Sequence, residues 1–180
     1  MTQLADRYYR LLIRAASSLQ SPFLLAVRLY WGWQFMQTGW GKLNDTQKVI
    51  GFFTHLGIPA PALNAYFISG LEFAGGFFLI LGLGSRLIAL PLAIDMMVAY
   101  IAADREALFS IFSDPDKFTA AAPYTFLVAS LIVLIFGPGK ASVDALLAAR
   151  LGRGDVATRT PTASQSALGT ALLGPLTPYR

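Results

Sequence analysis

Long apolar stretches, each interrupted inside by at most one charged residue, set the pattern of this chain. Four such stretches run over residues 22–39, 62–83, 86–103 and 120–136. Each approaches the ~20 residues that an α-helix needs to cross a hydrocarbon core of ~30 Å. The pattern therefore predicts an all-α integral membrane protein, built as a four-helix bundle.

Two segments outside these stretches have patterns of their own. Residues 1–20 place Arg7, Arg10 and Arg14 at three- and four-residue spacing, with leucines and tyrosines largely on another face. This predicts an amphipathic interfacial helix on an anionic membrane surface, and the segment lacks the apolar core and cleavage site of a signal peptide, so we expect it to be retained. Residues 43–61 are too apolar for an ordinary loop and too short to cross, which favours a re-entrant or interfacial segment at the outer face.

The C-terminal part of the chain changes character after the fourth stretch. Gly137-Pro138-Gly139 ends that stretch, as glycine and proline do at the C-terminus of a helix. Residues 152–180 are rich in Thr, Ser, Ala, Gly and Pro and lack helical periodicity. We therefore expect a membrane domain over residues 22–147 and a flexible cytoplasmic tail over residues 152–180.

The distribution of lysine and arginine predicts the orientation. With both termini inside, the outer loops carry only Lys42, Lys48, Arg105 and Lys117. Apart from Arg28 inside the first stretch, the N-terminal segment, the 84–86 turn and the C-terminal region carry the other basic residues. The positive-inside rule then favours a multi-pass chain with its N- and C-termini in the cytoplasm.

Composition agrees with a membrane class. The chain is 55% hydrophobic and only 13% charged, against about 25% charged residues in soluble domains, and its mean hydropathy is +0.55. The net charge of +4 is explained by topology, so no nucleic-acid partner is expected.

The absence of cysteine limits the redox chemistry of this chain. Without thiols the 180 residues cannot form a disulfide, a cysteine-ligated zinc site or an iron–sulfur cluster. A lone His55 cannot form a bis-histidine haem or a multi-histidine metal site. We expect no metal site and no covalently bound cofactor, and a redox role would need a quinone, another bound organic cofactor or a partner protein.

Three ionisable residues inside the apolar stretches are the candidate catalytic residues: Arg28, Glu72 and Asp95. A charge at membrane depth costs roughly 2.5–3.5 kcal/mol on insertion scales, so it usually faces a partner or a polar cavity. Arg28 and Glu72 form either a structural pair that specifies helix register or an acid and base flanking a ligand headgroup. One arginine cannot neutralise two buried carboxylates, so Asp95 is either protonated or faces water.

The candidate ligand-binding residues surround these three. In the first stretch Arg28 is followed at helical spacing by Gly32, Phe35, Gly39 and Lys42, which places all five on one stripe. Glycines on such a stripe let a helix or a ligand approach the backbone closely. Further candidates are the aromatic Trp40 beside Lys42, the single His55 of the outer segment, and Gly76 after Glu72, and these complete the set.

Four motifs in this order resemble the DoxX family of small four-helix membrane proteins. They are the stripe R-x3-G-x2-F-x3-G-x2-K, the element L-E-F-A-G-G, the turn G-L-G-S-R and the closing G-P-G-K-A-S-V-D, which together cover about residues 22–147. Many relatives carry a histidine in the third span, where this chain has Asp95. The family pattern marks, by their numbers in this chain, Arg28, Gly32, Phe35, Gly39, Lys42, Glu72, Gly76, Arg86, Gly137, Pro138, Gly139 and Asp144.

The resemblance implies a protein of the bacterial or archaeal cytoplasmic (inner) membrane. The related DoxD protein is the membrane subunit of a thiosulfate:quinone oxidoreductase and works with a second small subunit. By resemblance we expect a membrane subunit of a quinone-linked oxidoreductase, with a quinone or substrate site near Arg28 and Glu72. Its expected partners are the lipid bilayer, a quinone, and a second redox subunit or another copy of the chain.

Two other functions fit the sequence. One is a non-catalytic anchor or assembly subunit that recruits a soluble redox enzyme. The other is a proton-coupled transporter that uses Glu72 and Asp95. Transporters are often built from internal repeats, and the two halves of this chain show no convincing repeat, which disfavours transport.

Overall fold

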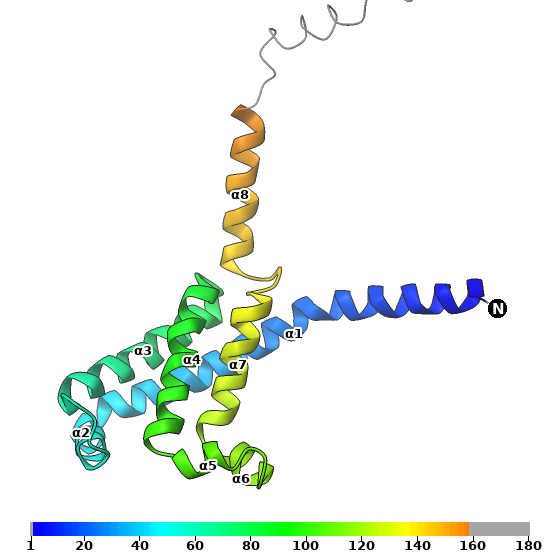
Figure 1. The fold of residues 1–180 in the computed structure, drawn as a ribbon. Helices are drawn as coiled ribbons and strands as arrows, with labels where there is room; N and C mark the ends of the chain where they lie inside the picture. The colour runs from blue at the N-terminus through cyan, green and yellow to red at the C-terminus, as the bar shows by residue number, and fades with distance from the viewer. Residues whose placement is uncertain (1, 159–180) are drawn as a thin grey trace, which may run out of the picture. The chain divides into compact units, whose positions relative to one another are not determined.

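The computed structural model describes residues 2–158, and these residues form helices without strands (Figure 1). The expected all-α class is therefore confirmed. The chain divides into a compact unit over residues 1–145 and a second unit from Leu146 onward. The helices are α1 (Thr2–Asn44), α2 (Thr46–His55), α3 (Pro61–Leu81), α4 (Ser85–Ala102), α5 (Arg105–Phe109), α6 (Pro115–Ala120), α7 (Pro123–Phe136) and α8 (Val143–Thr158).

Helix boundaries differ from the sequence-based expectation at both ends of the chain. The amphipathic segment 1–20 and the stretch 22–39 form one helix, because α1 runs through Pro22 without a break. Proline removes one backbone hydrogen bond but does not always end a helix in a membrane protein. At the other end α8 continues to Thr158, and residues 159–180 of the predicted tail lie outside the described residues.

Two helices of the described residues, α3 and α4, are long and apolar enough to cross a membrane. The fourth predicted stretch is divided, because Pro123 begins α7 as a separate helix of 14 residues. At 1.5 Å per residue α7 is about 21 Å long, shorter than a hydrocarbon core of about 30 Å. Helix length and composition thus identify two candidate spans, and the predicted four crossings are not confirmed.

Close backbone contact joins α1 to α3. A Cβ atom added to Gly32 would lie 2.9 Å from the carbonyl oxygen of Gly76, and one added to Gly39 would lie 2.7 Å from that of Ser69. Both distances are shorter than carbon–oxygen contacts allow, so only glycine fits at these two positions of α1. Small residues at helix contacts are the usual means of close packing in membrane proteins.

The core lies where α1, α3, α4 and α7 meet. Leu92 of α4 packs beneath Gly75 of α3, since its side-chain carbons lie 3.0–3.2 Å from where a Cβ atom on Gly75 would be. The fully buried Tyr100 donates a hydrogen bond from its hydroxyl to the carbonyl oxygen of Phe118 (2.8 Å), which ties α4 to α6. Other core residues are Phe35, Leu79, Met96, Leu127 and Val133.

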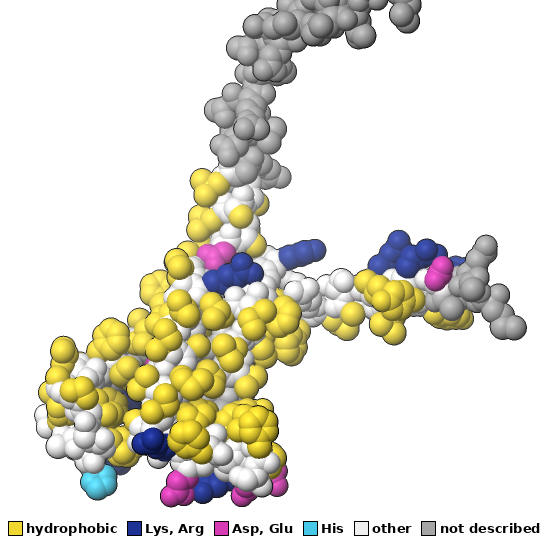
Figure 2. Space-filling model, in the orientation of Figure 1, with side chains coloured by type: hydrophobic (Ala, Val, Ile, Leu, Met, Phe, Trp, Pro, Cys, Tyr) yellow, Lys and Arg dark blue, Asp and Glu magenta, His cyan; other side chains and the backbone are white. Residues whose placement is uncertain are grey.

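Large apolar side chains cover much of the outer surface. On α4 the side chains of Leu87 and Ile94 are 82% and 55% exposed, and on α7 that of Ile135 is 63% exposed. The visible face of the helical body in Figure 2 is largely yellow, the colour of hydrophobic side chains. Exposed apolar area on this scale is typical of a surface covered by lipid or by another protein.

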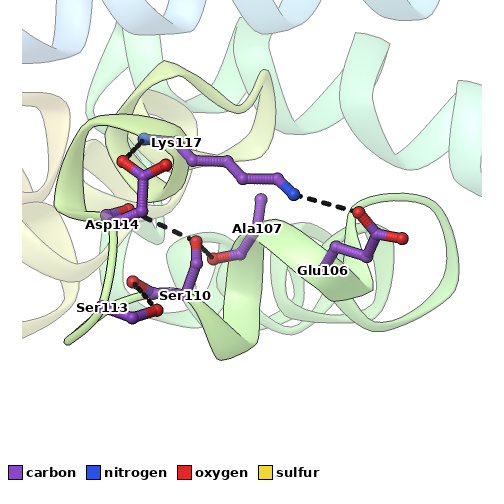
Figure 3. A network of polar contacts seen from close by, with 6 residues as sticks. All are labelled: Glu106, Ala107, Ser110, Ser113, Asp114 and Lys117. Carbon is purple, nitrogen blue, oxygen red and sulfur yellow. Dashed lines mark hydrogen bonds and ion pairs between the residues drawn. The ribbon is translucent and has the colours of Figure 1, made fainter.

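A polar network orders the connection between α4 and α7 (Figure 3). The ammonium group of Lys117 on α6 donates to the carboxylate of Glu106 on α5 at 3.0 Å, and Asp114 accepts from the backbone N–H of Lys117 at 3.2 Å. Asp114 thereby caps the start of α6. Because the Glu106 side chain is 90% exposed, this pair is solvated.

Candidate functional site

A partly buried ion pair joins the C-terminal part of α1 to the middle of α3. The ammonium nitrogen of Lys42 lies 2.6 Å from Oε1 of Glu72. Glu72 is 2% exposed, whereas the Lys42 side chain is 35% exposed. The close approach of α1 to α3 at Gly39 brings Lys42, one helical turn later, within reach of Glu72.

Asp95 of α4 lies against the same pair. Asp95 lines the same cavity as Lys42 and Glu72, and it is 7% exposed. Lys42, Glu72 and Asp95, which we call the carboxyl cluster, thus hold more acceptor oxygens than donors.

Two oxygens of the carboxyl cluster have no hydrogen-bond partner. These are Oε2 of Glu72 and Oδ2 of Asp95, both buried. A buried polar atom without a partner costs free energy comparable to a lost hydrogen bond, so it indicates a place where a ligand or a water molecule binds. The carboxyl cluster is therefore the least satisfied polar part of the described residues.

The carboxyl cluster lies at a cavity of about 470 Å³. This volume is within the range of small-molecule sites, which is about 300–1,000 Å³. Its walls are mostly apolar and come from α2 on one side and α4 on the other, with Lys48 and Asn64 as further polar residues. The wall residues that matter most below are Phe52, Phe53, Met96, Val98, Ala99 and Ala102.

The predicted pairing of Arg28 with Glu72 is wrong. The Arg28 guanidinium instead donates hydrogen bonds to the backbone carbonyls of Leu79 (2.9 Å) and Ile80 (3.1 Å) in the last turn of α3. Leu79 is seven residues beyond Glu72, or about 10 Å along the helix at 1.5 Å per residue. Arg28 and Glu72 therefore lie at different levels of α3, and Lys42 takes the place expected for Arg28.

Arg28 also binds the loop between α7 and α8. It donates to the carbonyls of Pro138 and Ala141, the latter at 3.1 Å. Beside it, Asp144 accepts from the backbone N–H groups of Gly84 (2.7 Å) and Ser85 (3.0 Å) at the start of α4. Arg28 is 1% exposed. Its N–H donors bond to backbone carbonyls at the end of α3 and in the loop after α7, so its contacts are those of a structural residue.

The other predicted ligand-binding residues divide between packing and surface. Gly32, Gly39 and Gly76 form the close α1–α3 contact, and Phe35 is fully buried against Phe126, at 4.7 Å between ring centroids. None of these four lines the cavity. Trp40 and His55 are exposed and also lie outside the cavity lining; the Trp40 ring packs 5.7 Å from that of Phe73.

Sequence reasoning did not identify Lys48, Asn64 and the α2 aromatics as cavity residues. A signal for them was present, because the segment 43–61 is too apolar for an exposed loop. The helix α2 uses that apolarity to form one wall of the cavity, through residues such as Phe52 and Phe53.

Comparison with known proteins places the chain among membrane proteins. The DoxX family model matches residues 23–105. An uncharacterized membrane protein of Mycobacterium tuberculosis is 31% identical over 141 residues, which cover 72% of this chain and 83% of that protein. An uncharacterized protein of Haemophilus influenzae is 30% identical over 130 residues, 69% of this chain and 82% of that protein. No solved structure matches the chain.

Proposed function

Because the chain belongs to the DoxX family and is a membrane protein, we propose that it is the membrane subunit of a quinone-linked oxidoreductase. The proposed quinone site is the cavity formed by α1, α2, α3 and α4. The observation that carries the proposal is the pair of buried carboxyl oxygens, on Glu72 and Asp95, that lack partners at an apolar cavity.

The proposed topology has four crossings in the bacterial cytoplasmic membrane, with both termini in the cytoplasm. It is supported by the concentration of arginines in the N-terminal segment, at the α3–α4 turn and after α7. In this orientation the carboxyl cluster is reached from the outer side, where α2 lies between α1 and α3 in the chain.

The donor set of the carboxyl cluster fits a quinone headgroup. Quinone carbonyls accept hydrogen bonds, and the cluster offers the ammonium group of Lys42 and, when Glu72 or Asp95 is protonated, a carboxyl O–H. Apolar walls such as Phe52, Met96 and Val98 suit the ring and an isoprenoid tail.

The residues of the cluster have distinct proposed tasks. When bound, a quinone would supply the redox chemistry, a reduction to the quinol by two electrons and two protons. One carboxyl group, on Asp95 or Glu72, would donate the first proton to a carbonyl oxygen, water would supply the second proton, and Lys42 would stabilise the carboxylate that remains. The two electrons come from a reduced sulfur anion such as thiosulfate, oxidised with the help of a second subunit.

Extraction of quinone from purified protein tests this function. Protein isolated from its native membrane in mild detergent is expected to carry about one quinone per chain, seen in the extract and in the borohydride difference spectrum. Glu72→Leu and Asp95→Leu each remove a hydrogen bond of about 1.4 kcal/mol, so quinone affinity should fall about tenfold.

A matched pair of substitutions on α4 locates the quinone. Ala99→Phe fills the cavity and should abolish quinone retention, whereas Met97→Phe adds an aromatic ring on an exposed position outside the cavity and should leave retention intact. Wild-type protein without quinone, isolated together with a soluble redox enzyme, would refute the proposal and favour an anchoring subunit.

A further inference from the structure

The helix α1 is far longer than its contacts with the rest of the protein require. Its 43 residues extend over about 65 Å at 1.5 Å per residue, twice a hydrocarbon core of about 30 Å. Contacts with the rest of the protein begin at Ser21, which bonds to the loop after α7, and at the buried Leu24. Every residue from 6 to 20 is exposed, so this part of α1, which we call the projecting segment, has no protein partner within the described residues.

The projecting segment has two chemically different faces. Arg7, Arg10 and Arg14 follow one another at intervals of three and four residues, and Ser18 and Ser21 continue the same stripe at the same intervals. On the opposite side large apolar side chains are 64–70% exposed: Tyr8, Tyr9, Leu12 and Leu19. Figure 2 shows dark blue atoms along one edge of this segment and yellow atoms along the other.

A hydrogen bond at the base of the segment fixes the direction of the polar stripe. The backbone N–H of Lys140, in the loop after α7, donates to Oγ of Ser21 at 3.0 Å. Since Ser21 lies on the same stripe as Arg14, the arginines face the side on which the α7–α8 loop lies. That loop follows the C-terminal end of α7, and its Lys140 is exposed and also basic. The arginines thus face a polar end of the bundle, and the apolar face points the other way.

We propose that the projecting segment lies in the membrane interface and binds anionic phospholipids. Its tyrosines and leucines enter the boundary between headgroups and acyl chains, and Arg7, Arg10 and Arg14 bind lipid phosphates. Anionic lipid is the occupant favoured by charge, because the projecting segment carries three arginines against a single carboxylate, that of Asp6. The apolar surface of α4 and α7, also exposed, adjoins the same hydrocarbon. The proposal is independent of the quinone site.

Spin labels can test the depth of each face in the whole protein. The chain has no cysteine, so Leu12→Cys and Ser18→Cys each give one labelling site, on the apolar and the polar face. The labelled full-length variants are reconstituted in nanodiscs of phosphatidylcholine with 30% phosphatidylglycerol or of phosphatidylcholine alone. Collisions with oxygen, which concentrates in lipid, and with a water-soluble nickel chelate, are then measured.

The proposal predicts opposite accessibility at the two sites. In anionic nanodiscs the label at position 12 should collide several times more with oxygen than with the nickel chelate, and the label at position 18 should do the reverse. Without phosphatidylglycerol, or with Arg7, Arg10 and Arg14 all changed to Gln, this contrast should fall severalfold. Changing the same three residues to Lys should restore most of it, because charge is kept.

Two results would overturn the proposal. Equal exposure of both labels to the nickel chelate in anionic nanodiscs would mean that the segment is in water. Protection of the label at position 12 from both reagents would mean that a protein surface, such as a second copy of the chain, covers the apolar face.

Discussion

The two ends of the α1–α3 contact each hold a buried charge, and only one end is complete. At one end Arg28 binds backbone carbonyls of Leu79, Ile80, Pro138 and Ala141. At the other end, 14 residues or about 21 Å along α1, Lys42 pairs with Glu72 at a cavity that Asp95 also lines, and two carboxyl oxygens remain without partners. The hydrogen-bond donors of Arg28 are satisfied within the protein, whereas the carboxyl oxygens at the Lys42 end can still accept hydrogen bonds from a ligand.

This comparison shows how a buried charge with a structural role differs from one that can bind a ligand. A charge inside an apolar stretch indicates that something must satisfy it, and the backbone can do so as well as a ligand can. Arginine suits the backbone, since its planar group offers five N–H donors in fixed directions. The carboxyl cluster is a candidate site because its acceptors exceed its donors and a cavity reaches it.

Removing Arg28 should give the largest effect on stability. Arg28→Gln leaves buried carbonyls without donors, at about 1–3 kcal/mol for each one, so the protein should unfold at much lower temperature or fail to accumulate. Thermal unfolding in detergent, followed by circular dichroism, measures this. The control is Arg86→Gln, because exposed Arg86 makes a single bond to the carbonyl of Ile135 (3.2 Å). If Arg28→Gln folds normally but loses the ligand, the contrast between the two ends fails.

A methyl group at the α1–α3 contact should have the next largest effect. Gly39→Ala places a Cβ atom 2.7 Å from the Ser69 carbonyl oxygen, so the helices must separate. Overpacking of this kind typically costs about 1–3 kcal/mol. Gly41→Ala, two residues further along α1, meets open space and should leave the melting temperature unchanged. Equal melting temperatures for the two variants would show that α1 and α3 are not in close contact.

Breaking the Lys42–Glu72 pair should cost less, because Lys42 is partly exposed. Lys42→Met leaves Glu72 without its cation and should lower stability by about 1–2 kcal/mol, less than a fully buried pair would. Adding Glu72→Gln removes the uncompensated charge, so the double variant should recover part of the loss. A double-mutant cycle of melting temperatures measures the coupling. Additive effects would mean that Lys42 and Glu72 do not interact. The carboxyl cluster would then no longer be supported as a site.

The sequence predicted the fold class and several residues of the α1–α3 contact and of the carboxyl cluster. The predictions that failed concern contacts between segments far apart in the chain. Hydrophobic periodicity and glycine spacing predicted the all-α class and placed Gly32, Gly39 and Gly76 where close contact is needed. The charges Glu72 and Asp95 were recognised from their cost in an apolar stretch, and the structure places both at one cavity. Features set by spacing within one helix, or by composition within one apolar stretch, could be predicted.

Contacts between segments far apart in the chain could not be predicted in this way. The acceptors of Arg28 include Pro138 and Ala141, about 110 residues away, and backbone carbonyls carry no sequence signal. The pairing of Glu72 with Lys42 instead of Arg28 depends on how α1 is placed along α3. The cavity depends on the position of α2. The apolar residues of this segment indicated that it is not an exposed loop, but they did not predict a cavity.

The smallest effect is expected at the solvated pair of Figure 3. The hydrogen bond from Lys117, together with its positive charge, lowers the pKa of Glu106 below its ordinary value. A lowered pKa in the folded state contributes stability above the unfolded-state pKa, and this contribution is lost as the pH falls through the folded-state pKa. Because Glu106 is 90% exposed, water screens the pair and the contribution is small.

Lys117→Gln should therefore raise the pKa of Glu106 toward its ordinary value and leave the melting temperature at pH 7 unchanged. Carboxyl-carbon NMR titration of Glu106 measures the first effect, and thermal unfolding the second. A marked loss of thermal stability would mean that an exposed pair matters as much as the buried ones. Exposed ion pairs would then contribute to the stability of this protein as strongly as buried ones. Burial could then no longer be used to single out the carboxyl cluster among the polar residues.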